Sequence, residues 1–465
     1  MRRERLVAVA TLALLQVFVC AVGAFVLAGD GLGGLTAKPP VKAAPPRAPI
    51  AIVTAGPVLA PPPGGTPPGK GTLAARLTHA LGDSALGDNV GAVVLDVAAG
   101  AMLFGSKADT GVTPASTTKV ATAVAALTSL GPDTRVATRV VQSKAGEITL
   151  VGGGDPLLAG PKAGKSSDYP RSASLVALAS RTARALKAAG VASVGLTYDD
   201  SLFSGPRTAP GWKPGYVPEG SVAPVTALMI DEGRQDPRGS ARYPDPPRSA
   251  AEAFGSLLAH YGVKVGKSIK RAKAAPTATE IARVESPPVY ELVEHMLTMS
   301  DNDVAEALAH LVALKEGEPG TFAGVSQAVQ GTLKKLGVGE GVAVYDGSGL
   351  STRNRITPTA LARLIALSAS PGNPRLRALI SGLPIAGFTG TLGHRYGKQD
   401  TKAAAGVVRA KTGTLNGVNT LTGLARTSDG RLVAFAFMAD NVPDPDGAVA
   451  ALDRLAALVS GCGCS

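Results

Sequence analysis

Apolar residues recur along the chain at two spacings, and these spacings predict helices and strands in a definite order. Between residues 73 and 81 the apolar positions follow helical spacing, whereas 90–96 and 101–104 are short apolar runs typical of strands. An Ala- and Leu-rich run from Pro114 to Leu127 predicts a helix that begins at the proline. The first part of the folded chain is therefore predicted as a helix, two strands and a second helix.

The C-terminal part of the chain shows the same two spacings. A helical run is followed by three strand-like runs and a closing helical run, at 289–297, 407–412, 419–426, 431–438 and 448–459. The dipeptide Asp429-Gly430 marks the turn before the last strand. Helices that flank an antiparallel sheet follow from this order, and this arrangement is the α+β class.

Residues 136–284 differ in texture from the sequence on either side. Pro, Gly and Arg are frequent there, and the strand-like pieces, such as 191–198, are short. We therefore predict an inserted, mostly β domain at 136–284. The flanking segments 71–135 and 285–460 are then predicted to form one domain together.

The N-terminal region predicts a membrane segment and a spacer. A basic stub, 1–5, precedes an apolar run, 6–28, which as a helix would be about 35 Å long and could cross a bilayer. The run exceeds the usual signal-peptide core and no clear cleavage site follows it, so an anchor is favoured over a cleaved signal. The Pro-rich stretch 29–70 predicts an extended linker, and 461–465 reads as a short tail.

The distribution of charge along the chain narrows the range of expected partners. The arginines before the apolar run predict a cytoplasmic N-terminus, which places the rest of the chain outside the membrane, or secreted if the run is cleaved. The formal net charge is +12, but Lys and Arg are scattered. We therefore expect an anionic wall or membrane surface and no nucleic acid as partner. The role of Cys462 and Cys464 and the oligomeric state cannot be read from the sequence.

Three short motifs carry the candidate chemistry, at Ser116–Lys119, Ser300–Asn302 and Lys411–Thr414. The first places a hydroxyl and an amine on one face of a helix, three residues apart, where the lysine can act as the base for the serine. A lowered lysine pKa is required, and partial burial together with the second cation, Lys411, is expected to lower it. Each motif alone is weak, but the three in this order form a strong joint signal.

The second and third motifs offer groups that could bind a substrate and relay protons. Ser300 and Asn302 are predicted to point a hydroxyl and an amide into one cleft, from a loop. Lys411 and Thr412 suit a carboxylate, and Gly413 lets a ligand backbone lie close along a strand.

With these motifs the sequence resembles the D-alanyl-D-alanine carboxypeptidase and endopeptidase family of low-molecular-mass, class C penicillin-binding proteins, over about residues 72–460. Three further stretches resemble that family, at 152–157, at 345–350 with 356–358, and at 383–387 with 390–392. The resemblance implies a β-lactamase-like transpeptidase fold interrupted by an insert. It also implies peptidoglycan stem peptides ending in D-Ala-D-Ala as substrates and β-lactam antibiotics as inhibitors.

The family pattern also implies a role for each matching residue. Ser116 would be the acyl-ester nucleophile, Lys119 its base, Ser300 the proton relay to the leaving amine, and Lys411 the anchor of the terminal carboxylate. Substrate binding would be completed by Asn302, Thr412, Gly413 and Thr414, with the backbone N–H groups of Ser116 and Thr414 as the oxyanion hole. Whether the terminal D-Ala or a peptide cross-link is preferred stays open.

Two rival functions remain. A serine β-lactamase shares the three motifs, but the Glu-x-x-Leu-Asn segment that class A enzymes use for deacylation is missing between the second and third. A catalytically silent wall-binding scaffold would not need Ser116, Lys119 and Lys411 intact. No His-Glu-x-x-His, Cys-x-x-Cys or phosphate-loop motif occurs, so neither a metal nor a cofactor is expected.

Overall fold

The computed structural model describes residues 16, 70–163 and 169–462. The predicted anchor, most of the predicted linker and most of the tail lie outside these residues, with the exceptions of residues 16, 70, 461 and 462. Within the described part of the chain, no helix is long and apolar enough to cross a membrane. The fold described below is that of residues 70–462.

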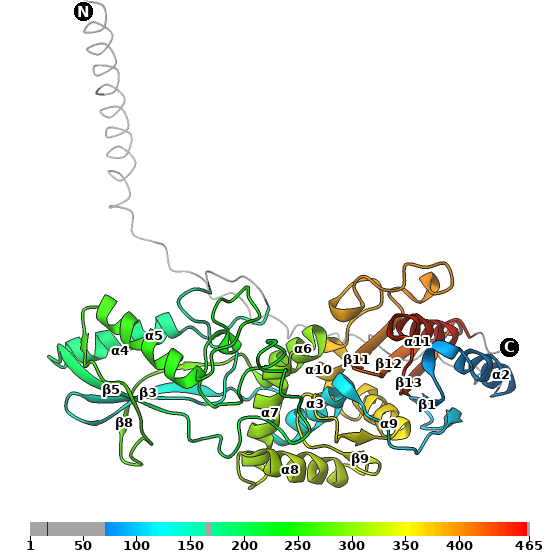
Figure 1. Cartoon of the computed structure of the whole chain (residues 1–465), viewed down its shortest axis with the longest axis horizontal. Helices are drawn as coiled ribbons and strands as arrows, with labels where there is room; N and C mark the ends of the chain where they lie inside the picture. Colours follow the sequence, from blue (N-terminus) through cyan, green and yellow to red (C-terminus); the bar gives the residue numbers. More distant parts are fainter. Residues whose placement is uncertain (1–15, 17–69, 164–168, 463–465) are drawn as a thin grey trace, which may run out of the picture. The chain divides into compact units, whose positions relative to one another are not determined.

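One antiparallel sheet is built from both ends of this region (Figure 1). Its strand order is β11-β12-β13-β1-β2. The first two strands in the chain, β1 and β2, pair with the C-terminal hairpins through β13. The strands are β1 (Asn89–Asp96), β2 (Met102–Ser106), β11 (Val408–Leu415), β12 (Val418–Arg426) and β13 (Leu432–Asp440). The sequence prediction of an antiparallel sheet from these five runs is therefore confirmed.

Helices cover both faces of this sheet, which explains why its strands are apolar without alternation. On β1, Val93 and Leu95 face one core and Ala92 and Val94 face the other. The second core is closed by α2 (Lys70–Leu81) and α11 (Pro445–Ser460), which pack against each other. The first core is larger and is closed by α3, α6, α7, α8, α9 and α10, whose bounds are Thr118–Ser129, Val289–Met299, Asn302–Lys315, Phe322–Lys335, Pro358–Ala369 and Arg377–Gly382.

A second, mixed sheet lies between the first two motifs in the sequence. Its strand order is β6-β5-β4-β3-β8, and β7 also pairs with β5. β4 and β5 are parallel, whereas β3 pairs antiparallel with β4 and β8. The strands are β3 (Ala137–Lys144), β4 (Glu147–Val151), β5 (Ser193–Asp199), β6 (Lys264–Val265), β7 (Lys270–Arg271) and β8 (Thr279–Glu285).

Two helices pack on this second sheet and form its own core, α4 (Leu175–Ala188) and α5 (Pro246–His260). The prediction of a mostly β region is therefore corrected, because these helices are as prominent as the strands. α4 begins where Ser174 caps the N–H of Ala177, and the apolar face of α4 includes Leu178 and Leu186. Between β5 and α5 the chain runs through loops that reach the first domain, and these loops form part of the candidate site.

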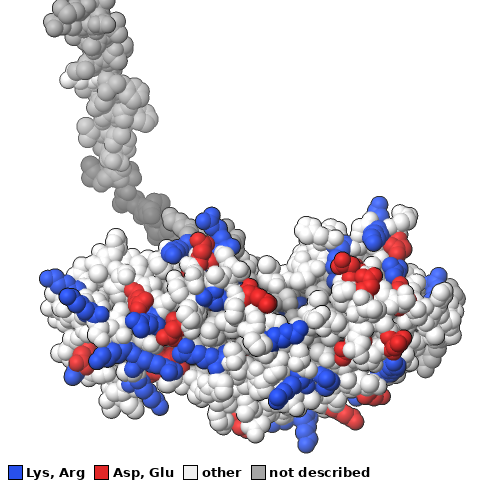
Figure 2. All heavy atoms as spheres, in the orientation of Figure 1, with Lys and Arg blue, Asp and Glu red and all other residues white. Residues whose placement is uncertain are grey.

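Charged side chains are dispersed over the surface. Figure 2 shows Lys and Arg over the part of the visible face that carries β3, β5 and β8 and over the part that carries α11, with Asp and Glu among them. This agrees with the scattered basic residues of the sequence.

Candidate active site

Ser116 lies in a 3-10 turn, Ala115–Thr117, directly before α3. The predicted helix start at Pro114 is thus corrected, since the α-helix itself begins at Thr118. Ala115 has a positive φ of 49°, a conformation that costs energy for a residue with a Cβ. Gly349 packs against this turn so closely that a Cβ there would overlap the Ala115 carbonyl oxygen. The turn that holds Ser116 is therefore kept in a strained shape by the loop that faces it.

Lys119 lies one turn after the serine and is fully buried. Its Nζ is 3.1 Å from Ser116 Oγ, which confirms that the two side chains share one face. Nζ also donates to Asn302 Oδ1 at 2.7 Å and to the carbonyl of Ser348 at 2.7 Å. The lysine is thus surrounded by three oxygen atoms from three different segments.

Burial lowers the pKa of Lys119 to about 8, although the carboxylates of Asp346 and Glu306 oppose this effect. The pKa of Lys411 is also lowered, well below its ordinary value, first by burial and then by the charge of Lys119. The sequence predicted that burial and the charge of Lys411 would both lower the pKa of Lys119. Burial is the main cause, whereas the repulsion between the two lysines lowers the pKa of Lys411.

The second motif joins two helices. Ser300 ends α6 in the left-handed conformation, with φ of 58°, and Asp301 caps α7 by accepting the N–H of Val304 at 2.9 Å. Asn302 is the first residue of α7, so the prediction that it lies in a loop is corrected. Ser300 Oγ is 2.8 Å from Lys411 Nζ. The second motif therefore contacts the lysines of both other motifs.

The third motif lies on β11, the edge strand of the sheet. Lys411 is buried, and its Nζ also donates to the carbonyl of Thr412 at 2.8 Å. A Cβ at Gly413 would overlap Thr420 Oγ1 and lie 2.7 Å from the Pro114 carbonyl oxygen. Glycine is therefore needed here because the strand runs against the turn that holds Ser116.

The loop 345–350 supports Lys119. This role was not predicted from the sequence. The buried Asp346 carboxylate accepts the N–H groups of Gly349 and Ser351 at 3.0 and 2.7 Å and the indole N–H of Trp212 at 2.8 Å. The Glu306 carboxylate accepts the N–H of Ser348 at 2.8 Å. Together these carboxylates fix the Ser348 carbonyl that binds Lys119. An acidic residue inside a Gly-rich turn was the available signal for Asp346.

These groups open into a pocket of about 780 Å³. Residues from all three motifs line it, together with residues of loop 213–221 from the region between β5 and α5: Ser116, Ser300, Asn302 and Thr414 from the motifs, and Lys213, Tyr216, Glu219 and Ser221 from the loop. This wall was not predicted from the sequence. Loop 213–221 carries no motif, and it lies far from the three motifs in the chain.

The titratable groups beside the motifs have partners of their own. His295 Nε2 is 3.2 Å from Asp301 Oδ2, and Glu232 pairs with Arg234 at 2.7 Å. Glu232, His295 and Asp301 place three possible ligand atoms within 4.8 Å of one another, the one such group among the described residues. Since each already contacts a charged side chain or ring nitrogen, this group is an ion-pair network rather than an open metal site.

Comparison with known proteins identifies the arrangement. The model of the D-Ala-D-Ala carboxypeptidase 3 (S13) family matches residues 73–241 and 235–459. The chain belongs to this family. As an S13 enzyme it is a serine-type D-Ala-D-Ala carboxypeptidase of the penicillin-binding class, as the resemblance of its motifs predicted.

The S13 enzyme is similar to known proteins over most of its length. Carboxypeptidase DacB of Mycolicibacterium smegmatis is 36% identical over 465 residues, which cover 98% of this chain and 97% of the relative. The D-alanyl-D-alanine carboxypeptidase of Actinomadura sp. (strain R39) is 27% identical and covers 74% of this chain and 76% of its own. The crystal structure of penicillin binding protein 4 (dacB) from Haemophilus influenzae matches with a TM-score of 0.66 at 22% identity, over 82% of this chain and 97% of that one. The α+β, penicillin-binding fold is thereby confirmed.

Proposed function

We propose that this S13 enzyme removes the terminal D-alanine of peptidoglycan stem peptides through an acyl-enzyme on Ser116. The observation that carries the proposal is the set of oxygens around Lys119. A neutral amine has two N–H groups and one lone pair. Asn302 Oδ1 and the Ser348 carbonyl accept the two N–H groups, which leaves the lone pair for the Ser116 hydroxyl at 3.1 Å. The lysine is thus held as a base.

The other motif residues supply the remaining steps of an acyl transfer. Ser116 Oγ attacks the carbonyl of the D-Ala-D-Ala bond while its proton moves to Lys119. The N–H groups of Ser116 and Thr414 stabilise the oxyanion of the tetrahedral intermediate. Ser300, 2.8 Å from Lys411 Nζ, passes a proton to the leaving amine of D-alanine. Water then hydrolyses the ester on Ser116.

Substrate would lie along the edge strand β11. A free strand edge can pair with an extended peptide. The first part of β11 is already bridged at Arg409 to Ile385, but the pocket opens beside its later part, at Thr414. Lys411 and Thr412 would bind the terminal carboxylate, and Asn302 would bind a substrate amide. Gly413 would keep the strand, and with it the bound peptide, close to Ser116. A β-lactam would acylate the same serine.

A labelling experiment tests the nucleophile. A fluorescent penicillin should label the purified protein covalently, and Ser116→Ala should abolish the label. Ser84→Ala serves as a matched control, because Ser84 is exposed, also lies in a 3-10 turn and is outside the pocket. Undiminished labelling of Ser116→Ala would refute the assignment.

A second comparison separates the peptidase from a β-lactamase. D-alanine release from a D-Ala-D-Ala peptide should far outpace penicillin hydrolysis, since no deacylating Glu-x-x-Leu-Asn segment is present. A digest of cross-linked muropeptides shows in addition whether cross-links, which present the same type of bond to Ser116, are cleaved. Penicillin turnover without D-alanine release would favour the β-lactamase.

Location follows from the same proposal. Peptidoglycan lies outside the cytoplasmic membrane, so the catalytic body acts there. We propose that residues 6–28 anchor the chain, that 29–70 space the body from the membrane, and that 136–284 form the inserted domain between 71–135 and 285–460.

A further inference from the structure

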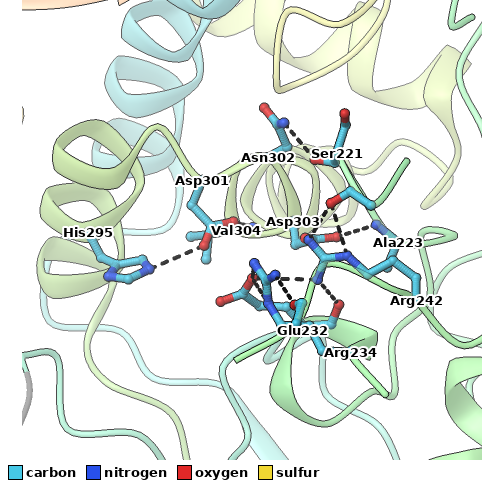
Figure 3. A network of polar contacts seen from close by, with 12 residues as sticks. Ser221, Ala223, Glu232, Arg234, Arg242, His295, Asp301, Asn302, Asp303 and Val304 are labelled. Carbon is cyan, nitrogen blue, oxygen red and sulfur yellow. Dashed lines mark hydrogen bonds and ion pairs between the residues drawn. The ribbon is translucent and has the colours of Figure 1, made fainter. Parts of the chain in front are cut away.

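A buried ion pair connects the loops between β5 and α5 to the second motif (Figure 3). Asp303 follows Asn302 in the first turn of α7, and its side chain is 3% exposed. One carboxylate oxygen, Oδ2, lies 2.9 Å from Nη2 of Arg242, whose side chain is 2% exposed. The other, Oδ1, accepts the N–H of Ala223 at 2.7 Å. Two segments that come well before the motif in the chain thus meet at Asp303.

Arg242 is held on several sides besides Asp303. Its Nε and Nη2 donate to the Gly220 carbonyl at 3.3 and 3.2 Å, and its Nη1 donates to the Glu232 carbonyl at 2.5 Å. A planar guanidinium can make these bonds at once because its donors point in fixed, divergent directions. The 220–223 segment is therefore fixed at one end by Arg242, through Gly220, and at the other by Asp303, through Ala223.

The residue between these two ends touches the catalytic machinery. The Ser221 carbonyl accepts from Asn302 Nδ2 at 2.8 Å, while Asn302 Oδ1 accepts from Lys119 at 2.7 Å. An amide has a carbonyl side and an NH2 side, so a partner on one side decides which side faces the other. The Ser221 carbonyl therefore turns the acceptor of Asn302 toward Lys119.

The orientation matters for the chemistry at the lysine. With Oδ1 facing it, Lys119 donates to Asn302 and keeps its lone pair for Ser116. With the amide reversed, Nδ2 would face Lys119, either competing for the lone pair of the neutral amine or crowding an N–H against the ammonium. In both cases proton transfer from Ser116 becomes slower.

We propose that Arg242 is a positioning residue for the acylation of Ser116. It acts through the 220–223 segment, whose Ser221 carbonyl sets the orientation of Asn302. This inference rests on the proposed function, in which Ser116 is acylated with Lys119 as base. It adds an arginine from the region between β5 and α5, far from the three motifs in sequence, to the parts that the reaction requires.

The charge environment explains why an arginine fills this position. Burial and the nearby carboxylates of Asp301 and Glu232 raise the pKa of Asp303, and the Arg242 guanidinium opposes that rise. Removing the arginine would leave the buried Asp303 side chain without its counter-ion and the part-buried carbonyl groups of Gly220 and Glu232 without this donor. The 220–223 segment would then relax, and with it the contact to Asn302.

A double-mutant cycle tests the proposal. The rate constant for acylation by a fluorescent penicillin is measured for wild type, Arg242→Met, Asn302→Ala and the double variant. We expect Arg242→Met to slow acylation about 10- to 100-fold, in the range that misplaced catalytic groups lose, with little change in the non-covalent binding of penicillin. In the Asn302→Ala background the same change should slow acylation less than about threefold, because the group being positioned is gone.

Arg242→Lys repeats the cycle in a form that is expected to fold even if Arg242→Met does not. It keeps a positive charge beside Asp303, but one ammonium cannot replace the divergent donors to Gly220 and Glu232, so an intermediate loss of acylation is expected. Equal losses in the two backgrounds, or no loss in wild type, would overturn the proposal.

A matched control separates positioning from general destabilisation. Arg395 pairs with Asp453 of α11 at 2.6 Å, with side chains 18% and 9% exposed, and neither residue lines the pocket. Arg395→Met should lower the melting temperature yet leave the acylation rate within about twofold. An equal loss of acylation in this control would overturn the specific role of Arg242. Failure of the proposed function is distinct, since it would show as labelling that survives Ser116→Ala.

Discussion

As the proposed base, Lys119 must be neutral to accept the serine proton, and its burial shifts the equilibrium toward the neutral amine. Its side chain is fully buried, and burial is the largest cause of a pKa near 8. Asp346 and Glu306 pull in the other direction, so the pKa does not fall further. The balance leaves a modest fraction of the lysine neutral at pH 7, and that fraction grows as the pH rises.

The rate of Ser116 acylation should therefore depend on pH in a definite sense. A base must lose its proton before it acts, so kcat/KM should rise about tenfold per pH unit below the pKa and level off above about 8. Steady-state rates on a D-Ala-D-Ala peptide between pH 5.5 and 9.5 measure this. Melting temperatures over the same range control for unfolding. A profile that is flat from pH 6 to 9 would contradict the role of Lys119 as base.

The residues to which we assign the reaction could all be named from the sequence, because the spacing within each motif is local. The separation of Ser116 and Lys119 alone placed their side chains on one face, and the structure confirms it at 3.1 Å. Ser221 could not be found from the sequence, because it acts through its backbone carbonyl and therefore leaves no side-chain signature. Arg242 was equally hidden, since a lone arginine becomes informative only once Asp303 is known to lie beside it.

At the scale of elements, β11 lies in close contact with the turn that holds Ser116. Thr420 Oγ1 on the neighbouring strand donates to the Pro114 carbonyl at 2.9 Å, directly under Gly413. This hydrogen bond and the close packing of Gly413 hold β11 against the turn. Together they set the distance between the third motif and Ser116.

Gly413→Ala should therefore damage the site more than the rest of the fold. The added Cβ would overlap Thr420 Oγ1, so the strand or the turn must shift, at a cost of about 1–3 kcal/mol of stability. We expect penicillin acylation to fall at least tenfold, measured by labelling kinetics.

Gly331→Ala is the matched control for this change. Gly331 lies in α8, and a Cβ added there would meet no atom within 4 Å beyond the backbone of its own helix. Alanine should therefore raise stability by about 0.5–1 kcal/mol without affecting labelling. Normal acylation in Gly413→Ala would show that the close approach of β11 is not required.

Helices and strands whose apolar residues follow a clear period were predicted well from the sequence. The other elements were not. The three C-terminal strands and α11 were found because each apolar run is bounded by turn residues. α7 was missed because nearly its whole circumference is buried, from Asp303 to Ala313, so it lacks an amphipathic pattern. α4 and α5 were missed although Ser174 and Pro246 mark their starts.

On the scale of the whole molecule, the described residues 70–163 and 169–462 contain every group of the proposed reaction. The predicted anchor and nearly all of the predicted linker precede them in the sequence. Catalysis and attachment are therefore predicted to be separable along the chain.

Deletion of residues 1–69 tests this separation. The shortened protein should keep D-alanine release within about twofold of the full chain, because none of the site residues is removed. In cells, the full chain should sediment with membranes and the shortened one should not, since the apolar run 6–28 is the proposed anchor. Fractionation with an antibody to the catalytic body measures it, and full-length protein found only in the soluble fraction would exclude a retained anchor.

The indole of Trp212 gives the molecule an intrinsic optical probe. The chain has one tryptophan, its N–H is bound to the Asp346 carboxylate at 2.8 Å, and the next residue, Lys213, lines the pocket. Indole emission depends on the polarity and charge around the ring. The tryptophan fluorescence of the unmodified protein therefore comes from a single residue beside the pocket wall, where no other tryptophan can obscure it.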